Sequence, residues 1–384
     1  MKKVKLGDIC SILNGYAFKS DKYVNHGIRI IRIANVQKGF IEDADPQFYP
    51  KSEMNEIKRY MLEEGDILMS LTGNVGRVAL LQKSMLPAAL NQRVACLRIK
   101  DIEEVFKPYI FHYLNADSFE NKCVLSSKGV AQKNMSTEWL KEVQIPLPSI
   151  EEQKEIADRL DKVVGLIEKR KEQLAKLDQL VKSRFIEMFG DININDKRWN
   201  AQPLGELCTI VRGGSPRPIE NFLGGDVPWI KIGDATKGDN IYLHSTKEYI
   251  IRDGVKKSRM VKAGSLIFAN CGVSLGFARI ITFDGCIHDG WLAMEDIDAR
   301  MDKVFLLQAL NQMTDHFRKI APAGTQPNLN TAIMKAYVQI IPPMELQKEY
   351  IAFVEQIDKS KFDIQQSIDK LETLKKSLMQ QYFG

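Results

Sequence analysis

Residue types that suit catalysis are few in this sequence, and none belongs to a complete motif. His288-Asp289 has the composition of a general-base pair, and Asp45 with Glu56-Ile57-Lys58 loosely matches a metal-dependent nuclease triad. A histidine beside an aspartate is more often a turn or surface residue, and such loose spacing occurs by chance. There is no GxxxxGK[ST], HExxH or GxSxG motif, and no Asn- or Asp-Pro-Pro-aromatic motif of an amino methyltransferase. We therefore expect no catalytic residue and no metal site in this chain.

The cysteines and the apolar segments indicate a cellular compartment. The six cysteines lie apart, without a CxxC pair: Cys10, Cys96, Cys123, Cys208, Cys271 and Cys286. This pattern argues against zinc and against a disulfide framework, and it fits a reducing cytoplasm. No apolar run is long enough to span a bilayer, and no apolar signal-peptide core follows the basic start MKKVKLGDIC. We expect a cytoplasmic protein.

Basic residues close to aromatic ones form two candidate surfaces for nucleic acid. The net charge is only +5, from 54 basic and 49 acidic residues, so affinity for nucleic acid must come from local patches. The first half offers Lys19 and Lys22 near Tyr16, Phe18 and Tyr23. The second half offers Arg212, Arg217, Lys231, Lys237, Lys256, Lys257 and Arg259. Each residue alone is most simply a solvated charge, but the sets are candidate phosphate contacts, which position a protein on DNA without specifying sequence.

Two kinds of loop recur in the two halves. Paired glycines in LTGNVGR and NCGVSLGFAR could cradle phosphates, but they favour tight turns after buried strands. Arg77 and Arg279 flank these loops as further candidate backbone contacts. The loops 128–134 and 323–328 carry amides and amines, of which Lys128, Gln132, Lys133 and Gln326 are candidate DNA contacts. Amides can bind an adenine edge with two hydrogen bonds. They can equally bond the backbone and shape the turn, and both interpretations stay open.

The stretch from Ser149 to Gly190 is expected to form one long helix. Ser149 can cap its start with Glu152 completing a capping box, and Gly190 suits a left-handed cap at its end. At about 1.5 Å per residue the helix would be roughly 55–60 Å long. Its apolar stripe follows steps of four, three and seven: Ile156, Leu160, Val163, Ile167, Leu174, Leu177 and Val181. A stripe this narrow predicts a single partner helix.

The expected partner is the C-terminal stretch, residues 343–384. Gln153 corresponds to Gln347, and Phe189-Gly190 corresponds to Phe383-Gly384, both at an offset of 194 residues (347 − 153). The second stripe is Val354, Ile357, Ile364, Ile368, Leu371 and Leu378. The alternative is that each stripe packs on its own domain. We favour pairing within the chain because the two stretches have nearly the same length and phase.

Internal repeats predict a duplication of one plan. LGDIC recurs as LGELC, the glycine loops and amide loops recur in the same order, and each half ends in a proline-bearing strand exit before its long helix. We expect strands at 28–33, 65–70, 93–98 and 227–232, and helical spacing at 107–121 and 304–320. The segments between the repeated landmarks differ, which suits recognition of two unlike things at a fixed distance.

The repeated motifs resemble the specificity (S) subunit of type I restriction–modification systems over essentially the whole chain. The resemblance is carried by the LGDIC and LGELC starts, DVPWIKIGD, GDILMSLTGNVG with GSLIFANCGVSLG, KGVAQKNM with AGTQPNLN, and the PLPSIEEQKEI and PPMELQKEY helix entries. No single motif is decisive, but their order, occurring twice, is specific. The first half departs from the Pro-Trp form of the second at Gly27–Ile30.

The resemblance implies an α+β fold in which two mixed α/β target-recognition domains are joined by two long antiparallel coiled-coil helices. On this basis the domains are 1–148 and 203–342, the spacer helices are 149–190 and 343–384, and 191–202 is a linker. The chain would bind double-stranded DNA at a split site and would hold no cofactor. Two modification (M) subunits would bind S-adenosylmethionine and methylate adenine, and restriction (R) subunits, where present, would use ATP and Mg²⁺. The helix faces not used for pairing would dock M.

Two other hypotheses belong to different functional classes. A two-domain coiled-coil adaptor that binds proteins would show no sequence-dependent DNA binding in any assembly. A self-contained nuclease or methyltransferase would show activity as an isolated chain, against which the missing motifs argue. Salt-dependent DNA affinity without catalysis by the chain alone distinguishes the specificity subunit from both.

Overall fold

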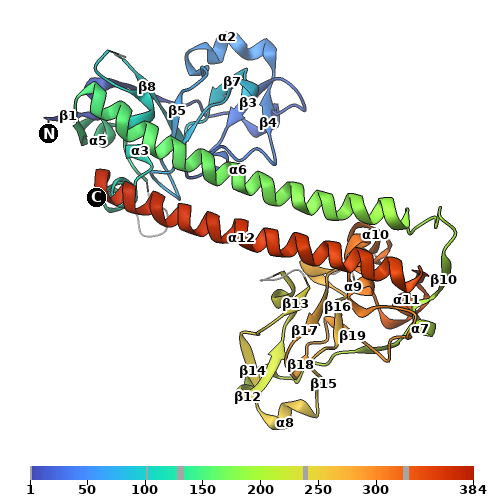
Figure 1. The fold of residues 1–384 in the computed structure, drawn as a ribbon. Helices are drawn as coiled ribbons and strands as arrows, with labels where there is room; N and C mark the ends of the chain where they lie inside the picture. Colours follow the sequence, from blue (N-terminus) through green and yellow to red (C-terminus); the bar gives the residue numbers. More distant parts are fainter. Residues whose placement is uncertain (1, 101–102, 128–133, 237–240, 323–327) are drawn as a thin grey trace. The chain divides into compact units, whose positions relative to one another are not determined.

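The computed structural model describes residues 2–100, 103–127, 134–236, 241–322 and 328–384, and it divides into two compact units (Figure 1). Unit 1 comprises Met1–Glu172 together with Gln365–Gly384, and unit 2 comprises Gln173–Ile364. The two longest helices, α6 (Ile150–Phe189) and α12 (Met344–Phe383), each contribute residues to both units. No helix in the described part of the chain is both long and apolar enough to cross a membrane.

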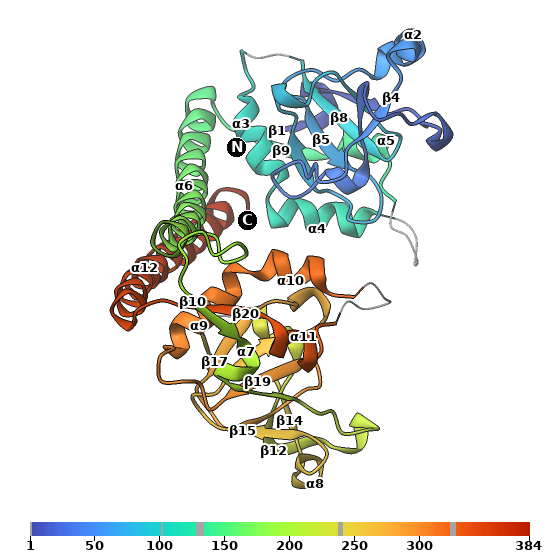
Figure 2. The same ribbon diagram turned by 90° about the vertical axis from the view of Figure 1, so that its right-hand side faces the viewer.

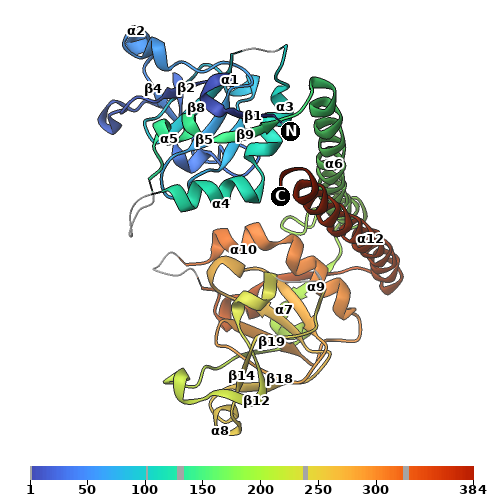
Figure 3. The same ribbon diagram turned by 90° about the vertical axis from the view of Figure 1, so that its left-hand side faces the viewer.

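Unit 1 contains three sheets. Strands β1 (Lys2–Lys5) and β9 (Gln144–Leu147) pair antiparallel beside helix α5 (Thr137–Glu142) (Figure 3). A second sheet has the order β2-β8-β5-β6, and a third has the order β4-β3-β7. Their strands are β2 (Cys10–Asn14), β8 (Val94–Ile99), β5 (Ile67–Ser70) and β6 (Val78–Leu80), then β4 (Gln47–Tyr49), β3 (Ile28–Ile31) and β7 (Ala88–Leu90).

Unit 2 repeats this plan. Strands β10 (Asn200–Pro203) and β20 (Val338–Ile341) pair antiparallel (Figure 2). The other sheets have the orders β11-β19-β16-β17-β13 and β14-β12-β18-β15. Their strands are β11 (Thr209–Arg212), β19 (Trp291–Glu295), β16 (Leu266–Ala269), β17 (Ala278–Ile281) and β13 (Tyr242–Leu243), then β14 (Glu248–Ile250), β12 (Leu223–Ile230), β18 (Gly285–Ile287) and β15 (Arg259–Val261). A two-stranded ribbon and two larger sheets therefore occur in the described residues of each unit, as the internal repeats predict.

The shorter helices also occur in corresponding places. Unit 1 has α1 (Leu6–Ile9), α2 (Met54–Ile57), α3 (Lys107–Leu114), α4 (Asp117–Ser126) and α5, and unit 2 has α7 (Leu204–Leu207), α8 (Arg252–Val255), α9 (Lys303–Gln312), α10 (Thr314–Ile320) and α11 (Thr331–Ala336). The predicted helical stretch 107–121 is interrupted between α3 and α4. There the Asn115 side chain donates to the Phe111 carbonyl at 3.0 Å, competing with the helical backbone, and Ala116 is extended.

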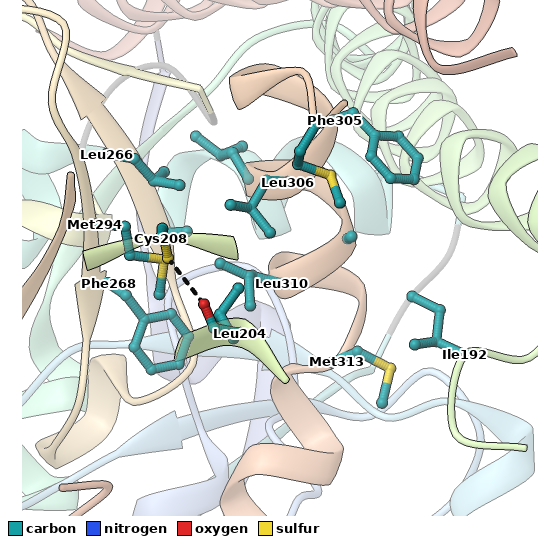
Figure 4. Close-up of a cluster of buried hydrophobic side chains, with 14 of the residues drawn as sticks. Ile192, Leu204, Cys208, Leu266, Phe268, Met294, Phe305, Leu306, Leu310 and Met313 are labelled. Atoms are coloured by element: carbon teal, nitrogen blue, oxygen red, sulfur yellow. Dashed lines mark hydrogen bonds between the residues drawn. The ribbon is translucent and has the colours of Figure 1, made fainter. Parts of the chain in front are cut away.

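Each unit has a large apolar core that its helices share with its sheets. In unit 2, Leu306 and Leu310 of α9 face Leu266 and Phe268 of β16, whereas Phe305 points the other way and packs against Phe189 of α6 (Figure 4). Cys208 lies in the same core, 3.4 Å from the Leu204 carbonyl. Burial raises the pKa of the Cys208 thiol to about 12, so this thiol stays protonated at neutral pH. The described cysteines are all free thiols.

The expected ends of the first long helix are confirmed. The Ser149 hydroxyl accepts a hydrogen bond from the Glu152 amide at 3.3 Å, and Gly190 has a φ of +77°, which favours glycine. Residues 200–202 of the predicted linker belong to β10. The linker is also anchored, because the Trp199 indole N–H donates to the Phe189 carbonyl at 2.9 Å.

Candidate nucleic-acid interface and helix junctions

Three strand ends of unit 2 meet at one place. Strand β11 ends at Arg212, β12 ends next to Lys231, and β18 ends next to His288. The His288 amide donates to the Ile230 carbonyl at 3.0 Å, and a Cβ on Gly213 would lie 2.2 Å from the His288 carbonyl oxygen. The close backbone approach requires glycine at 213. The fold thus gathers residues that are far apart in sequence.

Asp289 organises the loop that follows β11. Its carboxylate accepts a hydrogen bond from the Ser215 hydroxyl at 2.8 Å and from Arg217 Nη2 at 3.4 Å. Its backbone carbonyl accepts from Arg212 Nε at 2.9 Å. Asp289 therefore orients both arginines, while Arg217 stays 79% exposed.

His288 Nδ1 lies 3.0 Å from a carboxylate oxygen of Asp289, but the hydrogen bonding of this nitrogen is not that of a general-base pair. Such a pair needs the histidine Nδ1–H to donate to the carboxylate. Here Nδ1 accepts a hydrogen bond from the Gly290 amide at 2.9 Å, so that nitrogen carries no proton in neutral His288. Burial lowers the pKa of His288, and the nearby Lys231, Arg217 and Arg212 lower it further against the opposing effect of Asp289.

The loosely spaced nuclease triad does not converge either. Asp45 forms an ion pair with Arg32 at 3.3 Å, and Glu56 accepts a hydrogen bond from the Tyr16 hydroxyl at 2.6 Å. Over the described ranges, no group of three His, Cys, Asp or Glu side chains could hold a metal ion.

Several candidate cations of unit 2 lie around the Arg212 loop. The Arg259 guanidinium donates to the Arg212 carbonyl at 2.8 Å, and the Ser258 hydroxyl donates to the Gly214 carbonyl at 2.7 Å. Lys257, next to Ser258, lies 4.6 Å from the centroid of the Phe222 ring. We call the set Arg212, Arg217, Lys231, Lys256, Lys257 and Arg259 the unit 2 basic surface. All except half-buried Lys231, which pairs with Glu248 at 2.7 Å, are exposed.

The corresponding place in unit 1 is more aromatic and more fully ion-paired. A Cβ on Gly15 would lie 2.2 Å from the Asn91 carbonyl oxygen, matching Gly213 and His288. Tyr16 packs edge-on against Phe18 with centroids 5.1 Å apart. Lys19 is exposed, whereas Lys22 pairs with Glu53 at 3.0 Å.

The remaining candidate contacts fall into three groups. Arg77 is half-buried and donates to the Gln37 side-chain oxygen. Arg279 lies on β17, is only 4% exposed and donates to the Ala278 carbonyl at 2.7 Å. A side chain this buried is not available to a phosphate, so we leave Arg279 out of the interface. Lys128, Gln132, Lys133, Lys237 and Gln326 lie outside the described residues.

The predicted stripes of the long helices face inward, but not only toward each other. All thirteen stripe residues are buried or half-buried, namely Ile156, Leu160, Val163, Ile167, Leu174, Leu177, Val181, Val354, Ile357, Ile364, Ile368, Leu371 and Leu378. Leu160 belongs to the core of unit 1, and Val181, Val354 and Ile357 belong to the core of unit 2. Packing on the domains, which we had set against helix pairing, therefore accounts for part of each stripe.

Contacts between α6 and α12 occur within each unit. In unit 1, Lys171 pairs with Glu372 at 3.4 Å and Arg159 donates to the Tyr382 hydroxyl at 3.0 Å. In unit 2, Arg184 pairs with Glu349 at 2.9 Å and Lys361 pairs with Asp178 at 2.5 Å. Residue numbers rise along one helix as they fall along the other, so the helices run antiparallel where they touch.

Aromatic residues at the helix ends were missing from the predicted stripes. Phe383 is 6% exposed and packs edge-on against Tyr109 and Tyr113 in unit 1. Phe189 is fully buried and packs in the same way against Phe305 and Tyr350 in unit 2. The Phe-Gly pair repeated at an offset of 194 residues was the signal that could have identified them.

Comparisons with known proteins agree with this architecture. The family model for the type I restriction modification DNA specificity domain matches residues 1–179 and 196–375. The type I restriction enzyme MjaVIII specificity subunit of Methanocaldococcus jannaschii is 32% identical over 45% of this chain and 42% of its own length. The EcoKI specificity subunit of Escherichia coli K12 is 23% identical over 91% of this chain and 80% of its own length.

A solved structure shares the mixed α/β fold. It is the S subunit of a type I restriction–modification system from M. genitalium, with a TM-score of 0.56 at 15% identity, covering 98% of this chain and 94% of that one. Because the family match takes in both repeats and most of the sequence, the chain belongs to the type I restriction modification DNA specificity family.

Proposed function

We propose that this chain is the specificity subunit of a type I restriction–modification complex and that it recognises a DNA site in two parts. The observation that carries the proposal is the family match on each repeat separately, residues 1–179 and 196–375. Two recognition domains of the same fold but with different surfaces suit a DNA site whose two parts differ in sequence. The same match favours this function over the protein-binding adaptor.

Residues 1–148 and 203–342 act as the two target-recognition domains in this proposal. The unit 2 basic surface contacts phosphates, as do Lys19, Lys22 and Arg77 in unit 1. Phosphate contacts position the protein, and neighbouring side chains then meet base edges in the grooves. Residues 149–190 and 343–384 act as a coiled-coil spacer, supported by the antiparallel contacts of α6 and α12 within each unit.

The chemistry belongs to partner subunits in this proposal. Modification subunits would bind S-adenosylmethionine and methylate adenine, and restriction subunits would use ATP and Mg²⁺ to translocate and cleave DNA in the cytoplasm. Support comes from the names of the relatives, which are subunits of restriction enzymes. The His288-Asp289 geometry also argues against a base catalyst at the one sequence pair that suggested it.

Base-resolved mapping of adenine methylation in host DNA tests the proposal. The gene is compared intact and deleted, and complementation of the deletion restores the starting condition. We expect one split motif to lose methylation on deletion and to regain it on complementation. If methylation stays the same, the purified chain with its modification partner is tested for sequence-specific binding to DNA in vitro. If it binds no sequence specifically, the proposal is wrong.

A further inference from the structure

One buried glutamine lies at the same place in each long helix. Gln153 is the fourth residue of α6, and Gln347 is the fourth residue of α12. Both side chains have no exposed surface. A fully buried carboxamide must find hydrogen-bond partners, because an unsatisfied one carries a large desolvation cost.

Gln153 bonds to three backbone groups of unit 1. Its Nε2 donates to the carbonyls of Pro148 at 2.9 Å and Glu104 at 3.0 Å. Its Oε1 accepts from the Phe106 amide at 2.9 Å. Pro148 follows strand β9, and Phe106 precedes α3, so one side chain joins the start of the long helix to two other elements.

Gln347 makes the same three bonds in unit 2. Its Nε2 donates to the carbonyls of Pro342 at 2.7 Å and Arg300 at 2.9 Å. Its Oε1 accepts from the Asp302 amide at 2.8 Å. Pro342 follows β20 and Asp302 precedes α9, which are the counterparts of β9 and α3.

Only a glutamine satisfies these groups without a charge. The carboxamide supplies two donors and an acceptor from one planar group. Glutamate would lose both donors, and methionine of similar length would leave two carbonyls and one amide without a partner. The three bonds also fix the carboxamide in three directions, which holds the helix start at one angle against its domain.

We propose that Gln153 and Gln347 are positioning residues that set the spacing between the two DNA half-sites accepted by the chain. The proposal rests on the function proposed above. A helix of 40 residues amplifies any tilt at its start. At about 1.5 Å per residue, a tilt of roughly 5° displaces its far end by about 5 Å, more than the roughly 3.4 Å step between base pairs.

The first experiment measures spacing selectivity in the full chain assembled with its modification partner. Duplexes carry the methylated motif found by mapping, with its native spacer or with one base pair more or less. Gln153→Met and Gln347→Met are compared with Leu97→Ala and Leu292→Ala, fully buried core variants of units 1 and 2 whose loss of Tm serves as the match. We expect the preference for the native spacer to fall roughly tenfold in each glutamine variant, equivalent to about 1.4 kcal/mol, with affinity for a single half-site unchanged. In the two core variants the preference stays at the wild-type level.

A second experiment needs no DNA. Spin labels are attached at Glu138→Cys in α5 and Ala332→Cys in α11, both exposed positions, after half-buried Cys271 is replaced by serine. We expect the distance distribution between the labels to broaden in Gln153→Met and Gln347→Met and to stay narrow in the core variants. An unchanged distribution, or a broadened one with unchanged spacing preference, overturns the proposal. If wild-type protein shows no preference for any motif, the proposed function fails instead, and the label distances still decide whether the glutamines hold the helices.

Discussion

Units 1 and 2 contain equivalent backbone hydrogen bonds, but the partners of their basic side chains differ. The Leu6 amide donates to the Val143 carbonyl at 2.8 Å, and the Leu204 amide donates to the Tyr337 carbonyl at 2.7 Å. Thr72 bridges to Asn134 as Cys271 bridges to Asn328. Because these bonds involve the main chain, very different side chains can occupy the same frame.

Two cations beside the candidate surface of unit 1 pair with carboxylates, whereas two in the corresponding place of unit 2 bond to carbonyls. Arg29 pairs with Asp43 at 2.6 Å and Lys22 pairs with Glu53 at 3.0 Å. In unit 2, Arg212 and Arg259 donate to backbone carbonyls. A carbonyl holds a guanidinium in place without neutralising it, so Arg212 and Arg259 keep their charge for an anionic partner. The difference suggests that electrostatic attraction to DNA comes mainly from unit 2.

The largest expected effect concerns the aromatic residues at the C-terminal ends of the two long helices. Phe383 of α12 packs in unit 1, and Phe189 of α6 packs in unit 2. Phe383→Ala should destabilise unit 1, and Phe189→Ala should destabilise unit 2, each by about 3–5 kcal/mol because a buried aromatic ring leaves a cavity. Hydrogen exchange resolved by peptide measures the loss of protection in each unit. Equal loss of protection in both units for either variant would contradict this assignment of Phe383 to unit 1 and Phe189 to unit 2.

A second prediction concerns the charge difference between the units. Arg212→Ala with Arg259→Ala should lower the dependence of log affinity on log salt by about 1.8, at about 0.9 per phosphate contact, because both guanidiniums donate to carbonyls and not to carboxylates. Lys19→Ala with Lys22→Ala should lower it by about half as much, since Glu53 already neutralises Lys22. Titration of the mapped duplex at several salt concentrations gives the slopes, with exposed Lys319→Ala as control. Equal salt slopes for both double variants would show that units 1 and 2 contribute equally to electrostatic attraction.

A third prediction uses buried His112 of unit 1 and half-buried His288 of unit 2. Burial lowers the pKa of His112 and of His288 below 6.5. The unfolded chain therefore binds these protons first, so stability is fully present above about pH 6.5 and is lost as pH falls below it. His112→Gln and His288→Asn introduce the residues at the corresponding positions of the other unit, Gln308 and Asn91.

Each substitution should flatten the pH dependence of stability in its own unit only. Denaturation followed by peptide-resolved exchange between pH 5 and 7.5 provides the measurement. A variant that keeps the full wild-type slope in its unit would show that other groups carry the dependence.

The smallest expected effects come from ion pairs between the helices. Lys171 and Glu372 are more than half exposed, so Lys171→Ala should change stability by no more than about 0.5 kcal/mol. Lys361 is only 17% exposed beside Asp178, so Lys361→Ala should cost about 1–2 kcal/mol. Urea denaturation of the two variants in parallel tests the order, and a reversed order would show that burial does not govern these pairs.

Much of the fold was predictable because its signals are local. Ser149 and Gly190 mark the helix ends through hydrogen bonding and backbone conformation that depend only on nearby residues. Runs of β-branched residues identified β3, β5, β8 and β12 within a few residues of their observed limits. The repeat then implied that whatever held for one half would hold for the other.

The candidate site was harder to predict because contacts between distant strands decide it. Arg212 and Arg259 were both named from sequence, but their bond through a carbonyl depends on β11 pairing with β19 in one sheet and β15 pairing with β18 in another. Nothing in the sequence distinguishes Arg279 from an exposed arginine, and only the packing of β17 reveals that it is buried. The repeated glutamines could be seen in the sequence, but their backbone partners 45 to 49 residues away could not.

The division of the long helices affects how the chain folds during synthesis. Unit 2 is one continuous segment, residues 173–364, whereas unit 1 needs residues 365–384 to complete its core through Phe383. The Ser118 hydroxyl closes the connection by donating to the Phe383 carbonyl at 2.6 Å, across 265 positions of sequence. Contacts of such long range form late because they must first overcome loop-closure entropy. Unit 1 is translated before unit 2, but its core is therefore completed after that of unit 2. Until the C-terminal half of α12 has been synthesised, the surface that Phe383 covers stays exposed.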